Sequence, residues 1–210
     1  MEIISHRGLW KESSEKNTAA AFHRSFEQGF GTETDLRDHS GHIVISHDMA
    51  KGKEMKLSEF LDLANEFTNK DKRMTLALNI KSDGLVNDIV KILANYPNLD
   101  CFVFDMSIPD MRSYLKSNVP VFTRLSDVET TAIYDEQTDG IWLDNFGETL
   151  WFDGDYLKEL LARKKVCIVS SELHGFSPDI LWSTLKPFAN NENLILCTDH
   201  PEQACQHLRS

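Results

Sequence analysis

The chain has 210 residues, of which 41% are hydrophobic and 26% are charged, and this composition excludes an intrinsically disordered protein. The formal net charge of −11 disfavours binding to nucleic acid or to an anionic membrane surface. No secretory leader and no run of about 18 apolar residues occurs, so we expect no membrane insertion. The four cysteines lack metal-type spacing and are expected to be reduced thiols in a cytoplasmic protein. The length fits one domain, residues 1–210.

Short strand-like runs alternate with helical stretches along the whole chain. In the first half, strands are predicted at 2–5, 32–36, 74–80 and 100–104, and helices at 18–28, 57–67, 85–94 and 109–115. An extra extended piece at 43–46 follows a turn at Ser40-Gly41. In the second half, strands are predicted at 119–123, 140–143, 166–170 and 194–197, and helices at 126–134, 156–163, 178–185 and 201–208.

These eight strand–helix units predict an α/β protein with a parallel sheet. Eight units favour a compact (β/α)8 TIM barrel with a small insertion after the second strand. An open, doubly wound sheet is the main competing architecture.

Polar residues follow the carboxyl end of each predicted strand, which is the edge where a barrel carries its active site. Ordinary turn chemistry accounts for some of them, but not for two histidines and a pair of carboxylates. The residues at these ends that we consider as candidates are His6, Arg7, His47, Asp48, Asn79, Lys81, Glu172 and His174.

Glu33 and Asp35 lie two positions apart on a predicted strand, so their side chains share one face. Two carboxylates held together repel each other, and a bound divalent cation removes that repulsion. Carboxylate oxygens suit Mg²⁺ or Ca²⁺. A solvated polar strand face is the alternative interpretation, and the neighbouring histidines favour the metal site.

His6 and His47 are predicted to lie at neighbouring strand ends. Histidine titrates near neutral pH, so a pair of histidines can act as general base and general acid in one displacement. A single histidine would more often be a structural residue.

Five short motifs occur in a characteristic order: HRG at His6–Gly8, NTAAAF at Asn17–Phe22, E-x-D at Glu33–Asp35, VISHD at Val44–Asp48 and CTDHP at Cys197–Pro201. Together they resemble the glycerophosphodiester phosphodiesterase family. The resemblance is dense over about the first 50 residues, is thin in the middle and returns near the end.

The resemblance implies a (β/α)8 barrel that hydrolyses a small-molecule phosphodiester with the help of Mg²⁺ or Ca²⁺. It implies that His6 and His47 are the acid–base pair and that Glu33 and Asp35 bind the metal. It also implies phosphate contacts by Arg7 and Lys81. Asp48 and His174 complete the set of candidate substrate-binding residues.

The sequence departs from the family pattern in three ways, one of which is that the connection from Asp35 to His47 is about a residue short and lacks the usual threonine. Asn79 stands where the family usually has a glutamate as third metal ligand, so metal affinity is expected to fall unless another group compensates. Glu172, after the seventh strand, is the candidate for that group. Lys16 replaces the glutamate of the family's E-N-T motif, although Glu15 is adjacent.

Three other functions stay open at this stage. Asn79 raises the alternative of a barrel that binds a phosphorylated ligand without turning it over. A phospholipid-directed enzyme is disfavoured by the acidic charge, and a metal enzyme acting on a non-phosphate substrate would make the motifs accidental. The sequence leaves the oligomeric state open, including a homo-oligomer.

Overall fold

The computed structural model describes residues 1–69 and 72–209, in which parallel strands alternate with helices from end to end. The strands are β1 Glu2–His6, β2 Gly31–His39, β3 His42–Ile45, β4 Met74–Ile80, β5 Leu99–Phe104, β6 Phe122–Leu125, β7 Gly140–Leu143, β8 Lys165–Val169 and β9 Leu194–Thr198. Their order in the sheet is β5-β4-β2-β1-β9-β8-β7-β6, with β3 paired to β2. Eight parallel strands alternating with helices confirm the predicted (β/α)8 class.

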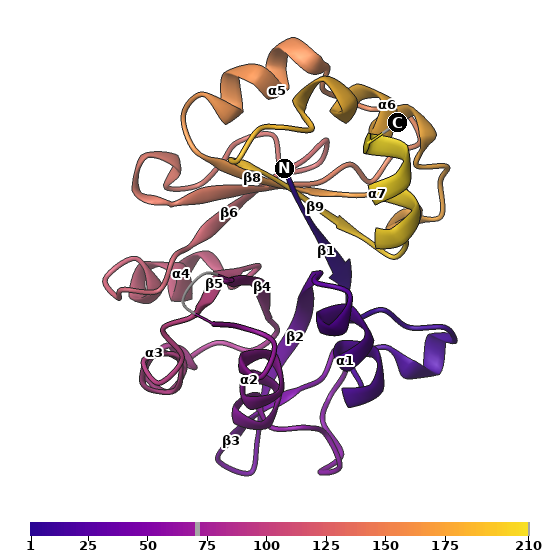
Figure 1. The fold of residues 1–210 in the computed structure, drawn as a ribbon. Helices are drawn as coiled ribbons and strands as arrows, with labels where there is room; N and C mark the ends of the chain where they lie inside the picture. Colours follow the sequence, from indigo (N-terminus) through magenta and orange to yellow (C-terminus); the bar gives the residue numbers. More distant parts are fainter. Residues whose placement is uncertain (70–71, 210) are drawn as a thin grey trace. The chain divides into compact units, whose positions relative to one another are not determined.

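Seven α-helices, which are labelled in Figure 1, and four short 3₁₀ helices are described along the chain. The α-helices are α1 Ala19–Glu27, α2 Leu57–Asn65, α3 Val86–Leu93, α4 Ile108–Tyr114, α5 Gly154–Leu161, α6 Asp179–Leu185 and α7 Pro201–Arg209. The 3₁₀ helices are η1 Ser13–Glu15, η2 Asp135–Gln137, η3 Ser171–His174 and η4 Lys186–Phe188. Among the helices of residues 1–69 and 72–209, none has both the length and the apolar sequence that a membrane span requires.

The chain folds as two compact units. The N-terminal unit is Ser5–Val121, and the C-terminal unit is Phe122–Ser210 together with Met1–Ile4. Strand β1 therefore contributes residues to both units. The prediction of a single domain over residues 1–210 stays a prediction.

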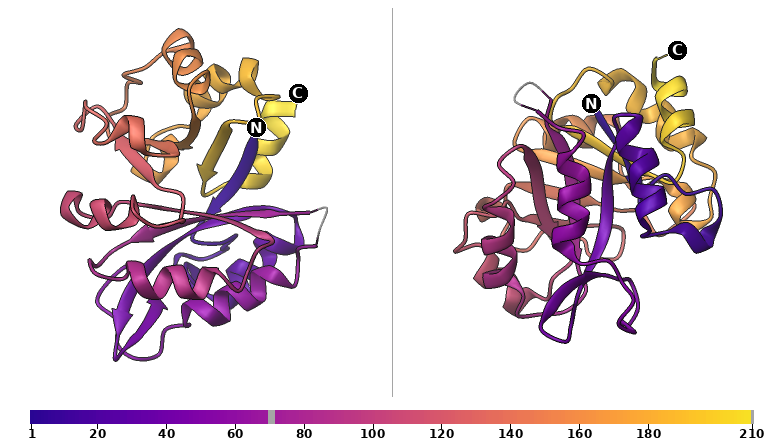
Figure 2. Two further views of the ribbon diagram at one scale, coloured as in Figure 1. Left: turned by 90° about the vertical axis from the view of Figure 1, so that its left-hand side faces the viewer. Right: turned by 60° about the horizontal axis from the view of Figure 1, so that its bottom comes forward.

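Aromatic side chains from α1 and α2 form part of the core of the N-terminal unit. The fully buried ring of Phe22 meets that of Phe60 edge-on, with centroids 4.7 Å apart, and Phe26 packs on the same ring at 6.0 Å. Edge-on contacts of this kind add to the free energy gained by burial. The two helices consequently lie side by side, as the right-hand view of Figure 2 shows.

The register of β2 places the predicted site residues next to one another. In the parallel pair β2–β4, Asp35 is the direct partner of Asn79, and Glu33 is the partner of Ala77. Strand β2 then turns back into β3 through Ser40 and Gly41, whose φ angles are 48° and 78°. Two positive φ angles suit a two-residue hairpin, so the predicted turn is confirmed.

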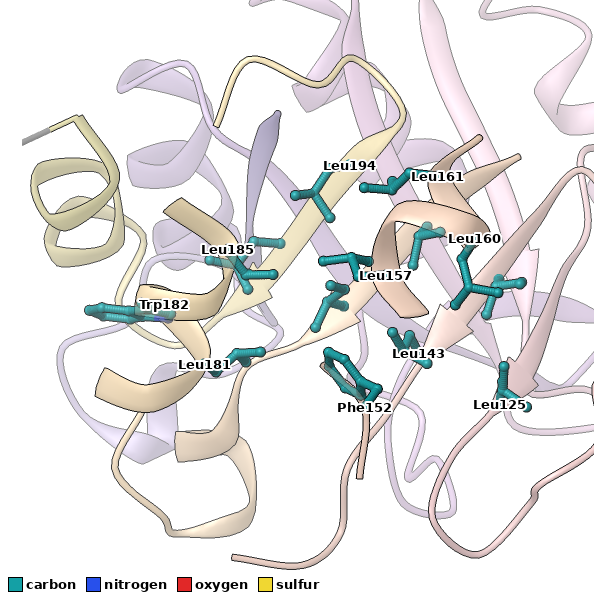
Figure 3. Close-up of a cluster of buried hydrophobic side chains, with 14 of the residues drawn as sticks. Leu125, Leu143, Phe152, Leu157, Leu160, Leu161, Leu181, Trp182, Leu185 and Leu194 are labelled. Atoms are coloured by element: carbon teal, nitrogen blue, oxygen red, sulfur yellow. The ribbon is translucent and has the colours of Figure 1, made fainter. Parts of the chain in front are cut away.

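A cluster of buried leucine, isoleucine, valine and aromatic side chains forms the core of the C-terminal unit (Figure 3). Leu157 and Leu160 come from α5, and Leu181 and Leu185 come from α6, so these helices contribute apolar faces to one cluster. The strands contribute their own buried residues, including Leu143. Burying one such leucine stabilises the fold by roughly 1.5–3 kcal/mol.

Two predicted elements differ from the structure. The predicted helix at 126–134 is wrong, because the described chain there is irregular and leads only into the 3₁₀ helix η2. The Ser126 hydroxyl accepts hydrogen bonds from the N–H groups of Val128 and Glu129, which favours a turn over a helix. The strand predicted at 119–123 begins later, since residues 120 and 121 instead pair with Val103 of β5.

Candidate active site

A tight turn after β1 positions the HRG motif. Arg7 and Gly8 have φ angles of 59° and 85°, in the left-handed region. A Cβ atom on Gly8 would lie 2.7 Å from the Ala21 Cβ and 2.9 Å from the Phe22 nitrogen, so the turn packs directly on α1. The Gly8 N–H also donates a hydrogen bond of 2.9 Å to the Thr32 hydroxyl. Only glycine fits this position without strain.

Asn17 connects the NTAAAF motif to the strand that carries the carboxylates. Its backbone N–H donates to the Arg7 carbonyl at 3.0 Å, and its Nδ2 donates to Asp35 Oδ2 at 2.9 Å. Its Oδ1 accepts a hydrogen bond of 2.8 Å from the Thr34 hydroxyl. Thr18 then caps α1 by accepting from the Ala21 N–H. The motif therefore starts a helix and holds Asp35 in place.

Glu33 and Asp35 are buried together with basic side chains around them. Asp35 is fully buried, and its two oxygens form ion pairs with Arg7 Nε at 2.8 Å and Lys81 Nζ at 3.4 Å. Glu33 is 2% exposed, and its Oε2 lies 3.8 Å from His6 Nε2. Burial raises the pKa of the Glu33 carboxyl well above its usual value, and the nearby Asp35 carboxylate raises this pKa further. The structure thus brings five of the predicted site residues together.

Asn79 extends this cluster on the adjacent strand β4 and is 7% exposed. Its Nδ2 donates a hydrogen bond of 3.1 Å to Asp105 Oδ2, at the end of β5. Asp105 was not among the predicted site residues. The available signal was its position directly after a strand, like the other candidates.

Three oxygen atoms of this cluster are buried without a hydrogen-bond partner: Glu33 Oε2, Asp35 Oδ1, which has only the ion pair with Lys81, and Asn79 Oδ1. Buried polar atoms normally have a partner, and oxygen donors are the ligands that Mg²⁺ and Ca²⁺ prefer. Within residues 1–69 and 72–209, no group of three or more histidine, cysteine, aspartate or glutamate side chains is arranged to hold a metal ion. The third oxygen here belongs to an amide, so the donor set fits a cation with two carboxylates and one neutral ligand.

His47 follows β3 and lines a cavity of about 890 Å³ together with Arg7, Asn17 and Asp48. The N–H of Ser46 donates to the Asp35 carbonyl at 2.9 Å, which places this loop beside the carboxylate strand. His47 Nδ1 lies 2.8 Å from Asp48 Oδ1, and this hydrogen bond lowers the pKa of the Asp48 carboxyl. The cavity therefore joins the second predicted histidine to the Arg7 side of the site.

One wall of the cavity is a short loop held together by Glu54. Its carboxylate accepts hydrogen bonds from the N–H groups of Lys51, Gly52 and Lys53 at 2.7, 2.7 and 2.9 Å. These bonds lower the pKa of Glu54 to about 2. Lys51 and Lys53 both line the cavity, as does Lys16, and these lysines share the lining with the acidic residues Asp48, Glu54 and Glu59.

Glu172 lies in the C-terminal unit, where both of its carboxylate oxygens accept hydrogen bonds. Oε1 accepts from the Thr198 hydroxyl and, at 3.0 Å, from the Asp199 N–H, while Oε2 accepts from the Ser170 hydroxyl. The role of Glu172 as a third ligand stays a prediction.

His174 also belongs to the C-terminal unit and contacts a buried carboxylate. Its Nε2 lies 2.7 Å from Asp144 Oδ1, and its ring lies 4.9 Å from that of Phe146. The hydrogen bond to Asp144 raises the pKa of His174. Arg124 lies 4.0 Å from the other oxygen of Asp144. The predicted contact of His174 with substrate stays a prediction.

The fold is similar over almost the whole chain to solved glycerophosphodiester phosphodiesterases. One from Parabacteroides distasonis ATCC 8503 has a TM-score of 0.67 at 17% identity, and 99% of this chain and 96% of that chain are covered. One from Thermotoga maritima has a TM-score of 0.62 at 18% identity, and 97% of this chain and 96% of that chain are covered. One from Agrobacterium tumefaciens str. C58 has a TM-score of 0.67 at 13% identity, and 98% of this chain and 99% of that chain are covered. No protein-family model and no curated protein matches the sequence. At these identities the likeness shows the fold, and at that level it confirms the resemblance seen in the motifs.

Proposed function

We propose that the protein is a divalent-cation-dependent phosphodiester hydrolase that acts on a glycerophosphodiester or a related small polyol or sugar phosphodiester. The observation that carries this proposal is the buried Glu33–Asp35 pair, with Arg7 and Lys81 ion-paired to Asp35 and His6 beside Glu33. Buried carboxylates next to fixed basic groups suit a site that takes up both a cation and an anionic phosphate. Mg²⁺ and Ca²⁺ are the cations that this oxygen donor set fits.

In this proposal, the basic side chains bind the phosphate. Arg7 offers a planar set of donors to the non-bridging oxygens, and Lys81 adds a second positive charge. Glu33, Asp35 and Asn79 would hold the cation, which when bound offsets the negative charge that builds on the phosphoryl oxygens. Asn17 fixes the orientation of Asp35 through its hydrogen bond to Oδ2.

The two histidines move protons. The Asp48 carboxylate can only accept a hydrogen bond, so the proton between it and His47 belongs to Nδ1. His47 Nε2 is then the atom that exchanges a proton with the substrate. His6 Nε2, next to Glu33 Oε2, is the second exchange site. One histidine takes the proton of the nucleophile, and the other gives a proton to the departing alcohol oxygen.

A barrel that binds a phosphorylated ligand without turning it over is the second candidate. Asn79 favours it, because one negative charge is missing from the proposed cation site. Both functions predict phosphate binding, but only the hydrolase predicts turnover that depends on a cation.

Turnover of a set of phosphodiesters with and without Mg²⁺ or Ca²⁺ tests the proposal. The set contains glycerophospho-alcohols, nucleotide-linked glycerol and sugar phosphodiesters. His6→Ala and His47→Ala should each lower kcat by about 10²–10⁴-fold, the usual contribution of a general acid or base. His42→Ala, an exposed histidine on β3, is the matched control and should keep the wild-type rate. Wild-type rates in both site variants would contradict the assignment.

A further inference from the structure

We propose that Asp105 is a positioning residue that compensates for Asn79. It orients the Asn79 amide so that the amide oxygen acts as a neutral cation ligand, and it returns the missing negative charge to the edge of the site. This inference rests on the proposed cation dependence.

The orientation of the amide follows from hydrogen-bond chemistry. A carboxylate only accepts hydrogen bonds, so the group of Asn79 that faces Asp105 Oδ2 at 3.1 Å is the Nδ2 donor. The Oδ1 atom must then point away from Asp105, and it is buried without a hydrogen-bond partner. Without Asp105 the amide could turn over, and an N–H group directed at a cation would repel it.

The strand register explains how Asp105 reaches Asn79. Strand β4 pairs with β5 so that Asn79 is the direct partner of Phe104, which places Asp105 one residue beyond the pair. Asp105 has a φ of 65°, a left-handed conformation that costs a non-glycine residue free energy. This turn at the end of β5 allows its carboxylate to face the Asn79 amide.

The charge of the site is distributed over three adjacent strands. β2 carries Glu33 and Asp35, β4 carries the neutral Asn79, and Asp105 directly follows β5. Three carboxylates therefore belong to this region, and one oxygen of the third, Asp105, contacts the proposed ligand residue Asn79. Partners of this kind commonly change metal affinity by about 10–100-fold when they are removed.

Titration calorimetry of the full chain with Mg²⁺ and with Ca²⁺ tests the inference. Asp105→Asn keeps an acceptor for the Asn79 amide but removes the charge, whereas Asp105→Ala removes both. We expect the Kd to rise by about 10-fold in Asp105→Asn and by up to about 100-fold in Asp105→Ala. Asp88→Asn, an exposed aspartate on α3, changes the net charge equally and should keep the wild-type Kd.

The double variant Asn79→Asp/Asp105→Asn moves the charge onto the ligand position. The amide introduced at position 105 can then donate to the carboxylate introduced at position 79, so we expect the Kd to return at least to the wild-type value. Circular dichroism shows whether each variant is folded, and if Asp105→Ala is not, the comparison of Asp105→Asn with the double variant decides. A wild-type Kd in Asp105→Ala, or no recovery in the double variant, overturns the inference while cation binding stands. A wild-type protein that binds neither cation overturns the proposed function as well.

Discussion

Two glycines at turns of the N-terminal unit differ in what surrounds them. Gly8 and Gly41 both have positive φ angles, 85° and 78°, but only Gly8 packs against α1. Gly41→Ala should lower the free energy of unfolding by about 1–2 kcal/mol, because the left-handed backbone alone disfavours a side chain there. Gly8→Ala should lower it by about 2–5 kcal/mol, because the new methyl group would also be forced against Ala21. Urea unfolding measures both, and equal losses would contradict the close contact with Ala21.

His174 and Asp144 predict a pH dependence of stability. The hydrogen bond to Asp144 raises the pKa of His174 above the value of about 6.5 for an unfolded chain. Because this pKa is raised, the stabilisation by the protonated His174 next to Asp144 is fully present below pH ~6.5. It is lost as the pH rises through the folded-state pKa of His174. The difference in unfolding free energy between wild type and Asp144→Asn should therefore narrow from pH 6 to pH 8. An NMR titration should show the pKa of His174 falling in the variant, and an unchanged value would refute the coupling.

The sequence predicted which residues gather around Asp35 better than it predicted their partners. Arg7, Lys81 and Asn79 follow from motif positions, since each lies next to a strand end. Asp105 could not be paired with Asn79 in advance, because the contact joins residues 26 positions apart. It depends on the β4–β5 register and on a positive φ, and neither can be obtained from the local pattern.

Helix α5 in the C-terminal unit begins at an aspartate cap. The Asp153 carboxylate accepts a hydrogen bond of 2.9 Å from the Tyr156 N–H. Asp153→Ala should destabilise the protein by about 1 kcal/mol, the usual cost of losing such a cap. Asp153→Ser keeps an acceptor and should retain most of the stability, as thermal unfolding can show. Equal losses in both variants would mean that the cap is not the cause.

Elements with a clear hydrophobic pattern were predicted close to their observed bounds. Strand β4 was predicted at 74–80 and is Met74–Ile80, because a run of buried and mostly apolar residues defines it. The helix at 126–134 failed because Ser126 forms local hydrogen bonds and Tyr134 is left-handed, with a φ of 55°. Neither feature changes the apolar spacing from which a helix is predicted.

The whole molecule should become more stable when a cation binds. A ligand that binds only the folded state raises the free energy of unfolding by about 2.7 kcal/mol when its free concentration is 100 times its Kd. For a chain of this size, that corresponds to a rise in Tm of roughly 5–11 °C. Thermal unfolding with Mg²⁺ or Ca²⁺, compared with NaCl at the same ionic strength, measures the effect. The variant Glu33→Gln/Asp35→Asn should lose it, and a rise that persists there would place the cation elsewhere.

The contact between Gly8 and α1 also constrains how this sequence can evolve. Any side chain at position 8 collides with Ala21, and a larger residue at position 21 would push the turn away from the helix. The two positions should therefore covary among related chains, with glycine at the first occurring together with a small residue at the second. A related chain with larger residues at positions 8 and 21 would need a different backbone path at Arg7 to keep the guanidinium in contact with Asp35.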